Sequence, residues 1–90
     1  MTDSEKTNAF EVRVYEDDAY MGAELIANDA IANLQDIGWN DRISSIKVIS
    51  GTWRFWEHVN MSGRSWVLGP GYYAHPTQFP NDTISSFEPA

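Results

Sequence analysis

The sequence contains no cysteine among its 90 residues. Disulfide bonds, thiol catalysis and thiolate zinc sites are therefore excluded. No apolar run approaches the roughly 20 residues of a membrane-spanning helix, and no basic patch followed by an apolar stretch opens the chain. We therefore expect no membrane partner and, by default, a cytoplasmic location, although a mature secreted protein would look the same.

Basic residues are scarce, since six Lys and Arg stand against 13 Asp and Glu and leave a formal net charge of −7. A nucleic acid is a poor partner for this chain, because phosphate binding needs a basic surface. The acidity itself fits either solubility or the attraction of cations. His58 and His75 are expected at the surface, and no nucleophile pattern accompanies them, so we predict no catalytic residue and no enzyme.

The hydrophobic content of 42%, with four each of Trp, Tyr and Phe, is enough for a globular core. Ninety residues fit one domain. Residues 1–9 are polar and without periodicity, which predicts a flexible N-terminal tail before a single domain at 10–90. We expect Trp39, Trp53, Trp56 and Trp66 in the core or at its corners.

A six-residue string occurs twice, as NDRISS at 40–45 and as NDTISS at 81–86, 41 residues apart. Each copy places acid, amide and hydroxyl oxygens before an apolar strand, and such oxygens suit a hard cation such as calcium. Without a metal, the same residues would simply begin a turn and a strand. The same offset aligns further identical residues: Arg13 with Arg54, Glu16 with Glu57, and Gly22 with Gly63. We therefore interpret the chain as two copies of one unit, at about 10–48 and 51–89.

Each unit is predicted to consist of short strands. Apolar residues alternate with polar ones at 10–14 and again at 53–55, which is the period of a half-buried strand. Gly22 and Gly63 stand where a hairpin turn needs a positive φ, before return strands at 23–27 and 64–68. We expect a strand at 46–48, a turn at 69–71, and one or two helical turns at 29–35 with Asp29 as N-cap. This order suggests an all-β Greek-key sandwich.

The stretch YEDDAYMG at 15–22 is similar to the aromatic hairpin signature of βγ-crystallin Greek keys, and the two six-residue strings resemble that family's calcium-binding signature. SGTWRF at 50–55 and LGPG at 68–71 resemble its single-domain microbial members, archaeal ones in particular. The resemblance covers about 11–89. It implies two Greek-key motifs forming a sandwich of two four-stranded antiparallel sheets, which binds two Ca²⁺ ions without catalysis. We expect a monomer.

Carried over by position, the resemblance implies ligands that share one property, an oxygen atom. The two ions would be bound by the side chains of Asp41 and Asp82, the backbone carbonyls of Arg42 and Thr83, the hydroxyls of Ser44 and Ser85, and the carbonyls of Glu16 and Glu57. Asn40, Ser45, Asn81 and Ser86 are expected to brace the loops by local hydrogen bonds. Which loop pairs with which hairpin stays open.

The chain departs from the family pattern at three positions. Met61 stands where a second aromatic is expected, and Ser62 where glycine is common. Arg42 places a positive side chain beside one ion where Thr83 is neutral, so we predict that the site using Arg42 is the weaker unless Asp17 and Asp18 compensate.

Two other functions stay open on the sequence. One is a structural or stress-associated protein whose calcium sites are vestigial. The other is an inhibitor-like module that binds a protein through the loop at 72–79. Calcium titration separates the first from a calcium-binding module, whose stability should rise with the ion.

Overall fold

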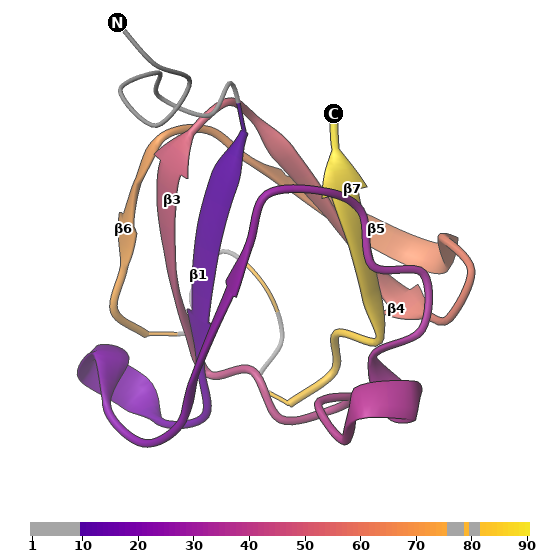
Figure 1. Cartoon of the computed structure of the whole chain (residues 1–90), viewed down its shortest axis with the longest axis horizontal. Coiled ribbons are helices and arrows are strands. Elements are labelled where there is room, and N and C mark those ends of the chain that lie inside the picture. The colour runs from indigo at the N-terminus through magenta and orange to yellow at the C-terminus, as the bar shows by residue number, and fades with distance from the viewer. Residues whose placement is uncertain (1–9, 76–78, 80–81) are drawn as a thin grey trace, which may run out of the picture.

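The structure is a computed structural model that describes residues 10–75, 79 and 82–90, so the predicted tail at 1–9 and Asn81 lie outside the described residues. In the described part of the chain, seven strands form two antiparallel sheets (Figure 1). The four-stranded sheet has the order β2-β1-β3-β6 and contains β2 (Glu24–Ala27), β1 (Glu11–Tyr15), β3 (Ser45–Ser50) and β6 (Gly71–Tyr73). The three-stranded sheet has the order β5-β4-β7 and contains β5 (Ser62–Leu68), β4 (Trp53–His58) and β7 (Ser86–Pro89).

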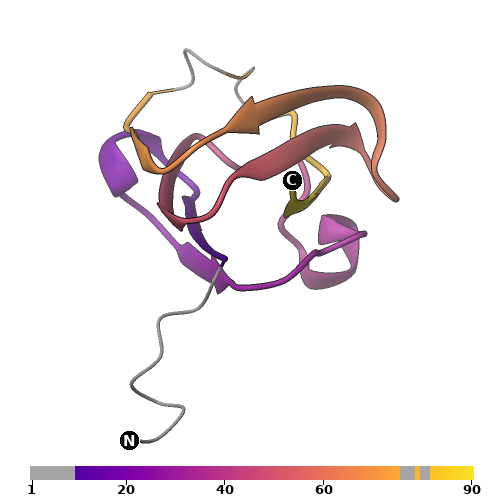
Figure 2. The same cartoon turned by 90° about the horizontal axis from the view of Figure 1, so that it is seen from above.

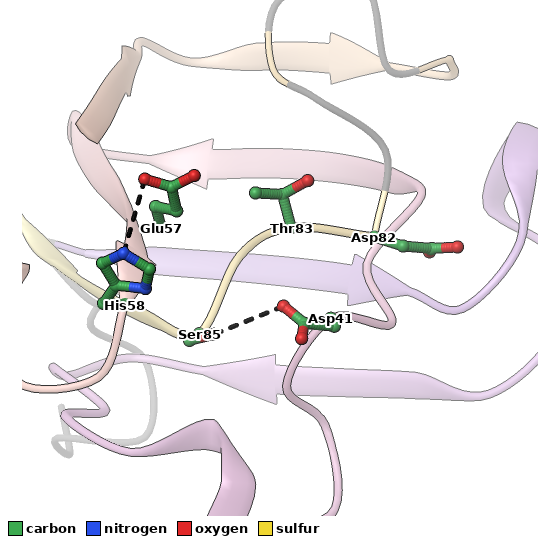
Figure 3. A pocket seen from close by; sticks show the side chains of 6 residues that line it. All are labelled: Asp41, Glu57, His58, Asp82, Thr83 and Ser85. Carbon is green, nitrogen blue, oxygen red and sulfur yellow. Dashed lines mark hydrogen bonds and ion pairs between the residues drawn. The ribbon is translucent and has the colours of Figure 1, made fainter. Parts of the chain in front are cut away.

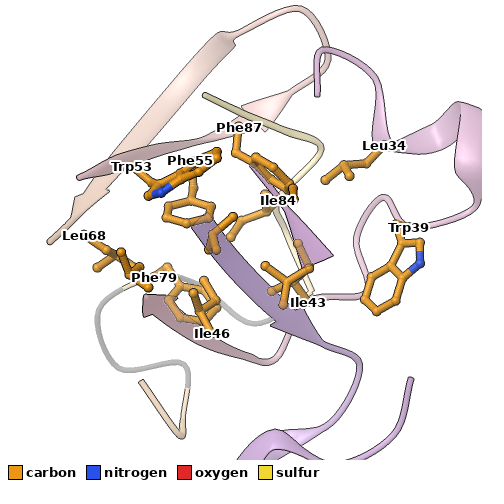
Figure 4. Close-up of a cluster of buried hydrophobic side chains, with 14 residues drawn as sticks. Leu34, Trp39, Ile43, Ile46, Trp53, Phe55, Leu68, Phe79, Ile84 and Phe87 are labelled. Atoms are coloured by element: carbon orange, nitrogen blue, oxygen red, sulfur yellow. The ribbon is translucent and has the colours of Figure 1, made fainter. Parts of the chain in front are cut away.

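The two sheets enclose one hydrophobic core. Seen from above, β4 and β5 lie across the molecule from β1 and β2 (Figure 2). The predicted alternation is confirmed, since Val12 and Val14 on β1 are buried while their neighbours Glu11 and Arg13 are half-buried. The core also takes in aromatic rings from the other sheet, including Trp53, Phe55 and Phe87 (Figure 4). Burial of these rings supplies the main driving force for folding.

The two units exchange their third strands. β6 belongs to the second unit by sequence, yet it pairs with β3 of the first, through Ile46 with Tyr73 and Val48 with Gly71. In the opposite direction, Ile31 of the first unit forms an isolated bridge to Phe87 on β7. Among the described residues the second sheet therefore has three strands plus this bridge, where a fourth strand had been expected. The exchange makes the two units parts of one domain.

Local predictions at the turns are confirmed in part. Gly22 and Gly63 have φ angles of 78° and 83°, as the hairpins require. A short 3₁₀ helix, η2 (Asp18–Tyr20), lies in the first hairpin turn. The second, η3 (Leu34–Ile37), starts later than predicted. Asn33 rather than Asp29 caps it, because the Asn33 side chain accepts a hydrogen bond from the backbone N–H of Gln35 at 3.0 Å.

The predictions for the aromatic residues are also confirmed in part. Trp39 and Trp53 are buried, whereas Trp56 on the central strand β4 and Trp66 on the edge strand β5 are half-buried. Phe79 is only 3% exposed and packs into the core, so it does not belong to a surface loop at 72–79, of which residues 76–78 lie outside the described part. The described residues include no helix long and apolar enough to cross a membrane.

Candidate metal centre

The two repeated strings form loops that lie against one another. The backbone N–H of Asp41 donates to the carbonyl of Ile84 at 3.0 Å, and the backbone N–H of Asp82 donates to the carbonyl of Ile43 at 3.2 Å. Both aspartates adopt the left-handed conformation, with φ of 57° and 54°. Aspartate tolerates this conformation better than most residues, which explains why an acid stands at the turn of each loop. The pair of loops is thus nearly symmetric.

Each serine that was predicted as a ligand lies beside the aspartate of the opposite loop. The hydroxyl of Ser44 donates to Oδ1 of Asp82 at 3.1 Å, and the hydroxyl of Ser85 donates to Oδ1 of Asp41 at 3.4 Å. The sequence left this pairing open. In the structure, hydroxyl and carboxylate oxygens come together across the two units rather than within either one.

The loops are also joined to the hairpins. The backbone N–H of Ser44 donates to the carbonyl of Tyr15, and that of Ser85 to the carbonyl of Trp56, both at 2.9 Å. Glu16 and Glu57, the next residues along the hairpins, therefore lie close to the loops. Two oxygen clusters result. The first cluster consists of Glu16, Arg42, Ser44 and Asp82, and the second cluster consists of Glu57, Thr83, Ser85 and Asp41.

A pocket of about 320 Å³ opens at the second cluster (Figure 3). All four residues of that cluster line it, together with Asp82 and His58. Asp41 points toward Ser85, whereas the carboxylate of Asp82 points away from the other labelled side chains. The residues that line the pocket all carry polar side chains, three of them carboxylates.

Sequence analysis missed His58, which it placed only at the surface. The side chain is 64% exposed, as expected, but it lines the pocket, and its Nε2 lies 3.6 Å from Oε1 of Glu57. The repeat contained the signal, because the offset of 41 aligns His58 with Asp17, the residue after Glu16. A repeat comparison restricted to identical residues passes over this position.

The charge of Arg42 is bound at the edge of the first cluster. Its guanidinium pairs with the carboxylate of Glu16, donates to the carbonyl of Gly38 at 2.6 Å, and stacks 5.4 Å from the ring centroid of Trp39. The Nε atom of Arg42 also donates to Oε2 of Glu16 at 3.1 Å. Glu16 is therefore neutralised by a cation that the second unit does not have, because Thr83 takes the place of Arg42 there.

Glu57 has a different counterion. Nη2 of Arg64 lies 2.9 Å from Oε2 of Glu57, and this hydrogen bond, more than any other cause, lowers the pKa of the Glu57 carboxyl. The Arg64 side chain is 69% exposed and comes from the return strand β5. The lowered pKa favours the charged form of Glu57 in the wall of the pocket.

The two aspartates after Glu16 contact residues other than Arg42. Oδ2 of Asp18 lies 3.2 Å from Nδ1 of His75, on the segment after β6. The carbonyl of Asp17 accepts a hydrogen bond from the hydroxyl of Ser45 at 2.6 Å. Among the described residues, neither aspartate contacts Arg42, so no direct contact supports the predicted compensation.

Ser45 and Ser86 brace the hairpins rather than their own loops. The Ser45 hydroxyl accepts from the backbone N–H of Tyr20 at 3.0 Å while it donates to Asp17, and the Ser86 hydroxyl accepts from Met61 at 3.1 Å while it donates to the carbonyl of His58 at 2.6 Å. Both serines are completely buried. Asn40 makes a longer contact, from Nδ2 to Oδ2 of Asp41 at 3.5 Å.

The donor set decides which metals fit. Within residues 10–75, 79 and 82–90, no three His, Cys, Asp or Glu side chains gather closely enough to hold a metal ion. Each cluster instead brings an aspartate carboxylate and a serine hydroxyl into contact. Such neutral and singly charged oxygens suit calcium, whose coordination is flexible, and disfavour zinc, which prefers nitrogen and sulfur.

Comparison with known proteins places this fold and these loops in a family. The Beta/Gamma crystallin family model matches residues 11–90. The crystal structure of a βγ-crystallin from an archaeon is 46% identical, with a TM-score of 0.86 over 92% of this chain and 100% of that one. The structure of a βγ-crystallin from Ciona intestinalis is 33% identical, with a TM-score of 0.86 over 89% of this chain and 99% of that one.

Curated relatives that match this chain are also crystallins. The Ciona intestinalis beta/gamma-crystallin is 38% identical over 63 residues, which are 70% of this chain and 75% of that protein. Gamma-crystallin A of Bos taurus is 33% identical over 67 residues, 74% of this chain but only 38% of that protein. This chain therefore spans most of the Ciona protein and well under half of the bovine one. The chain belongs to the βγ-crystallin family.

Proposed function

We propose that this βγ-crystallin domain binds two calcium ions, one at each oxygen cluster, and that it is not a catalyst. The observation that carries the proposal is the reciprocal contact of Ser44 with Asp82 and of Ser85 with Asp41. Each contact brings a hydroxyl and a carboxylate oxygen together beside a hairpin. Turns that only began a strand would not need these oxygens to meet across two units.

The ligand sets follow from the two clusters. The first ion would be held by the carboxylate of Asp82, the hydroxyl of Ser44 and the carbonyls of Arg42 and Glu16. The second would be held by the carboxylate of Asp41, the hydroxyl of Ser85 and the carbonyls of Thr83 and Glu57. Water would complete the coordination. With about one carboxylate in each set, the affinity should be moderate rather than that of a tight cytosolic buffer.

The consequence of binding would be stability. Each ligand set draws on both units, so the unfolded chain cannot assemble it and the ion binds only the folded state. Such an ion adds about 2.7 kcal/mol to the free energy of unfolding when its free concentration is a hundredfold above Kd. For a domain of this size the melting temperature should rise on the order of 10 °C.

Calcium calorimetry on the wild type and on two single variants tests the proposal. The wild type should show two sites, Asp41→Ala should lose the second, and Asp82→Ala should lose the first. Asp29→Ala is the matched control, because Asp29 is an exposed acid whose Oδ1 accepts from the backbone N–H of Ala30 and which belongs to neither cluster. It should leave both sites unchanged.

A flat titration together with a melting temperature that ignores calcium and chelator would contradict the proposal. That result would favour a structural protein with vestigial sites, the alternative that shares this fold. Titrations in which Asp41→Ala and Asp82→Ala behave like Asp29→Ala would keep calcium binding but reject the ligand sets. The proposal involves no nucleic acid and no membrane, and treats the domain as a monomer, which sedimentation at both calcium extremes tests.

A further inference from the structure

Lys47 is surrounded by tyrosine rings. Its Nζ atom lies 5.6 Å from the ring centroid of Tyr15, 4.7 Å from that of Tyr20 and 5.2 Å from that of Tyr72. The rings also pack edge to face on one another, with centroids 5.6 Å apart for Tyr15 and Tyr20 and 6.0 Å apart for Tyr20 and Tyr72. An ammonium group within about 6 Å of an aromatic face is attracted by the ring electrons. We call these four residues the tyrosine cage.

The cage joins four elements from both units. Tyr15 ends β1, Tyr20 lies in η2, Lys47 lies in the middle of β3, and Tyr72 lies on β6 of the second unit. In both views η2 lies beside the end of β6 (Figures 1 and 2). The cage is therefore the side-chain contact that attaches the first hairpin to the exchanged strand.

Two further contacts support this attachment. The backbone N–H of Ala19 donates to the carbonyl of Ala74 at 2.7 Å, and Asp18 pairs with His75 at 3.2 Å. Both partners follow β6 directly. The hairpin turn thus rests on the exchanged strand and the residues after it through its backbone, the Asp18–His75 contact and the cage.

The same hairpin contributes to the first oxygen cluster. Glu16 follows Tyr15, whose carbonyl accepts from the backbone N–H of Ser44. The proposed function assigns the Glu16 carbonyl to the first ion, so a shift of this hairpin would move that ligand relative to Ser44 and Asp82. If the cage already orders the hairpin before an ion binds, the ion does not have to order it. The affinity of the first site for calcium is then higher.

The second unit has the hairpin without the cage. The offset of 41 puts Trp56 at the position of Tyr15, Met61 at that of Tyr20 and Glu88 at that of Lys47. Nε1 of Trp56 donates to Oε2 of Glu88 at 3.0 Å instead. The backbone contact survives, because the N–H of Asn60 donates to the carbonyl of Ala32 at 2.6 Å, as that of Ala19 does to Ala74. The first hairpin thus packs against such a cage, and the second hairpin does not.

We infer that the tyrosine cage is a positioning element of the first calcium site, and that Lys47 sets the affinity of this site by fixing the first hairpin against β6. The inference rests on the proposed function. Lys47 contributes no oxygen to either cluster, so its effect on calcium is indirect. It is specific to one site because only the first hairpin packs against the cage.

Single-site backgrounds make the inference testable by calorimetry. Asp41→Ala retains the first site and Asp82→Ala retains the second. Adding Lys47→Met, which keeps much of the apolar stem and removes the charge, should weaken calcium about threefold to tenfold in the Asp41→Ala background. It should change the affinity by less than about twofold in the Asp82→Ala background. Lys47→Arg keeps a cation over the rings and should restore the first site.

A second variant keeps the inference testable if Lys47→Met folds poorly. Tyr72 is 67% exposed, so Tyr72→Leu removes one wall of the cage from the surface and should weaken the same site selectively. Equal weakening of both sites would reveal general destabilisation and overturn the inference, as would unchanged affinity in the Asp41→Ala background. Absence of calcium binding in both backgrounds before Lys47 is changed would instead overturn the proposed function, and the inference with it.

Discussion

Replacing Ser86 with alanine should destabilise the fold by about 2 to 3 kcal/mol, whether or not calcium is present. Its hydroxyl is completely buried, accepts from the backbone N–H of Met61 at 3.1 Å and donates to the carbonyl of His58 at 2.6 Å. Alanine leaves both backbone groups without this partner. A lost hydrogen bond costs about 1 to 1.5 kcal/mol for each group, and more where water cannot enter.

Urea denaturation in the presence of a chelator measures this effect. The midpoint should fall by about 1 to 2 M for a domain of this size. Ser62→Ala is the matched control, because its hydroxyl is exposed and donates only to the carbonyl of Val59 at 2.8 Å. Ser85→Ala, beside Ser86, should act differently and chiefly lower the calcium affinity of the second site.

Two results would refute this reasoning. The first is a Ser86→Ala midpoint no lower than that of Ser62→Ala, which would mean that the hairpin backbone finds other partners. The second is full recovery of Ser86→Ala stability at saturating calcium with a large loss in chelator alone. That outcome would make Ser86 a metal ligand rather than a brace of the hairpin.

Three further outcomes are expected. Gly63→Ala should lower the free energy of unfolding, measured by thermal denaturation, by about 1 kcal/mol or more. The loss should exceed that of Gly38→Ala, because both glycines have a positive φ but only at Gly63 would an added Cβ meet the His58 ring, at 2.5 Å. Equal losses in the two variants would contradict this. Burial, aided by its hydrogen bond to a glutamate, raises the pKa of Tyr15 to about 12. The folded chain therefore holds this proton more tightly than the unfolded chain does. The contribution of Tyr15 to stability is complete below about pH 10 and is lost between about pH 10 and 12. Tyr15→Phe should flatten that part of the pH–stability curve. Arg42→Thr should strengthen calcium at the first site alone, and a calorimetric titration unchanged at both sites would reject the role of its charge.

Much of the local structure could be predicted because it depends on neighbours in sequence. The alternation around Val12 and Val14 specifies which face of β1 is buried. Gly22 and Gly63 mark the hairpins, since few other residues adopt their φ. The helical turn was misplaced because Asp29 and Asn33 are both good caps, and a sequence pattern cannot tell which side chain meets a free N–H. The start of η3 at Leu34 depends on that leucine being buried in the core.

The sequence by itself determined the family, the two units and the oxygen-bearing residues, because a repeat of 41 positions is visible without any fold. Only the tertiary structure decided how they combine. The pairing of Ser44 with Asp82 and of Ser85 with Asp41 depends on two loops 41 residues apart meeting face to face. The exchange of β6, the burial of Phe79 and the tyrosine cage have the same origin. Contacts between distant residues are selected by packing of the whole core, which no local pattern encodes.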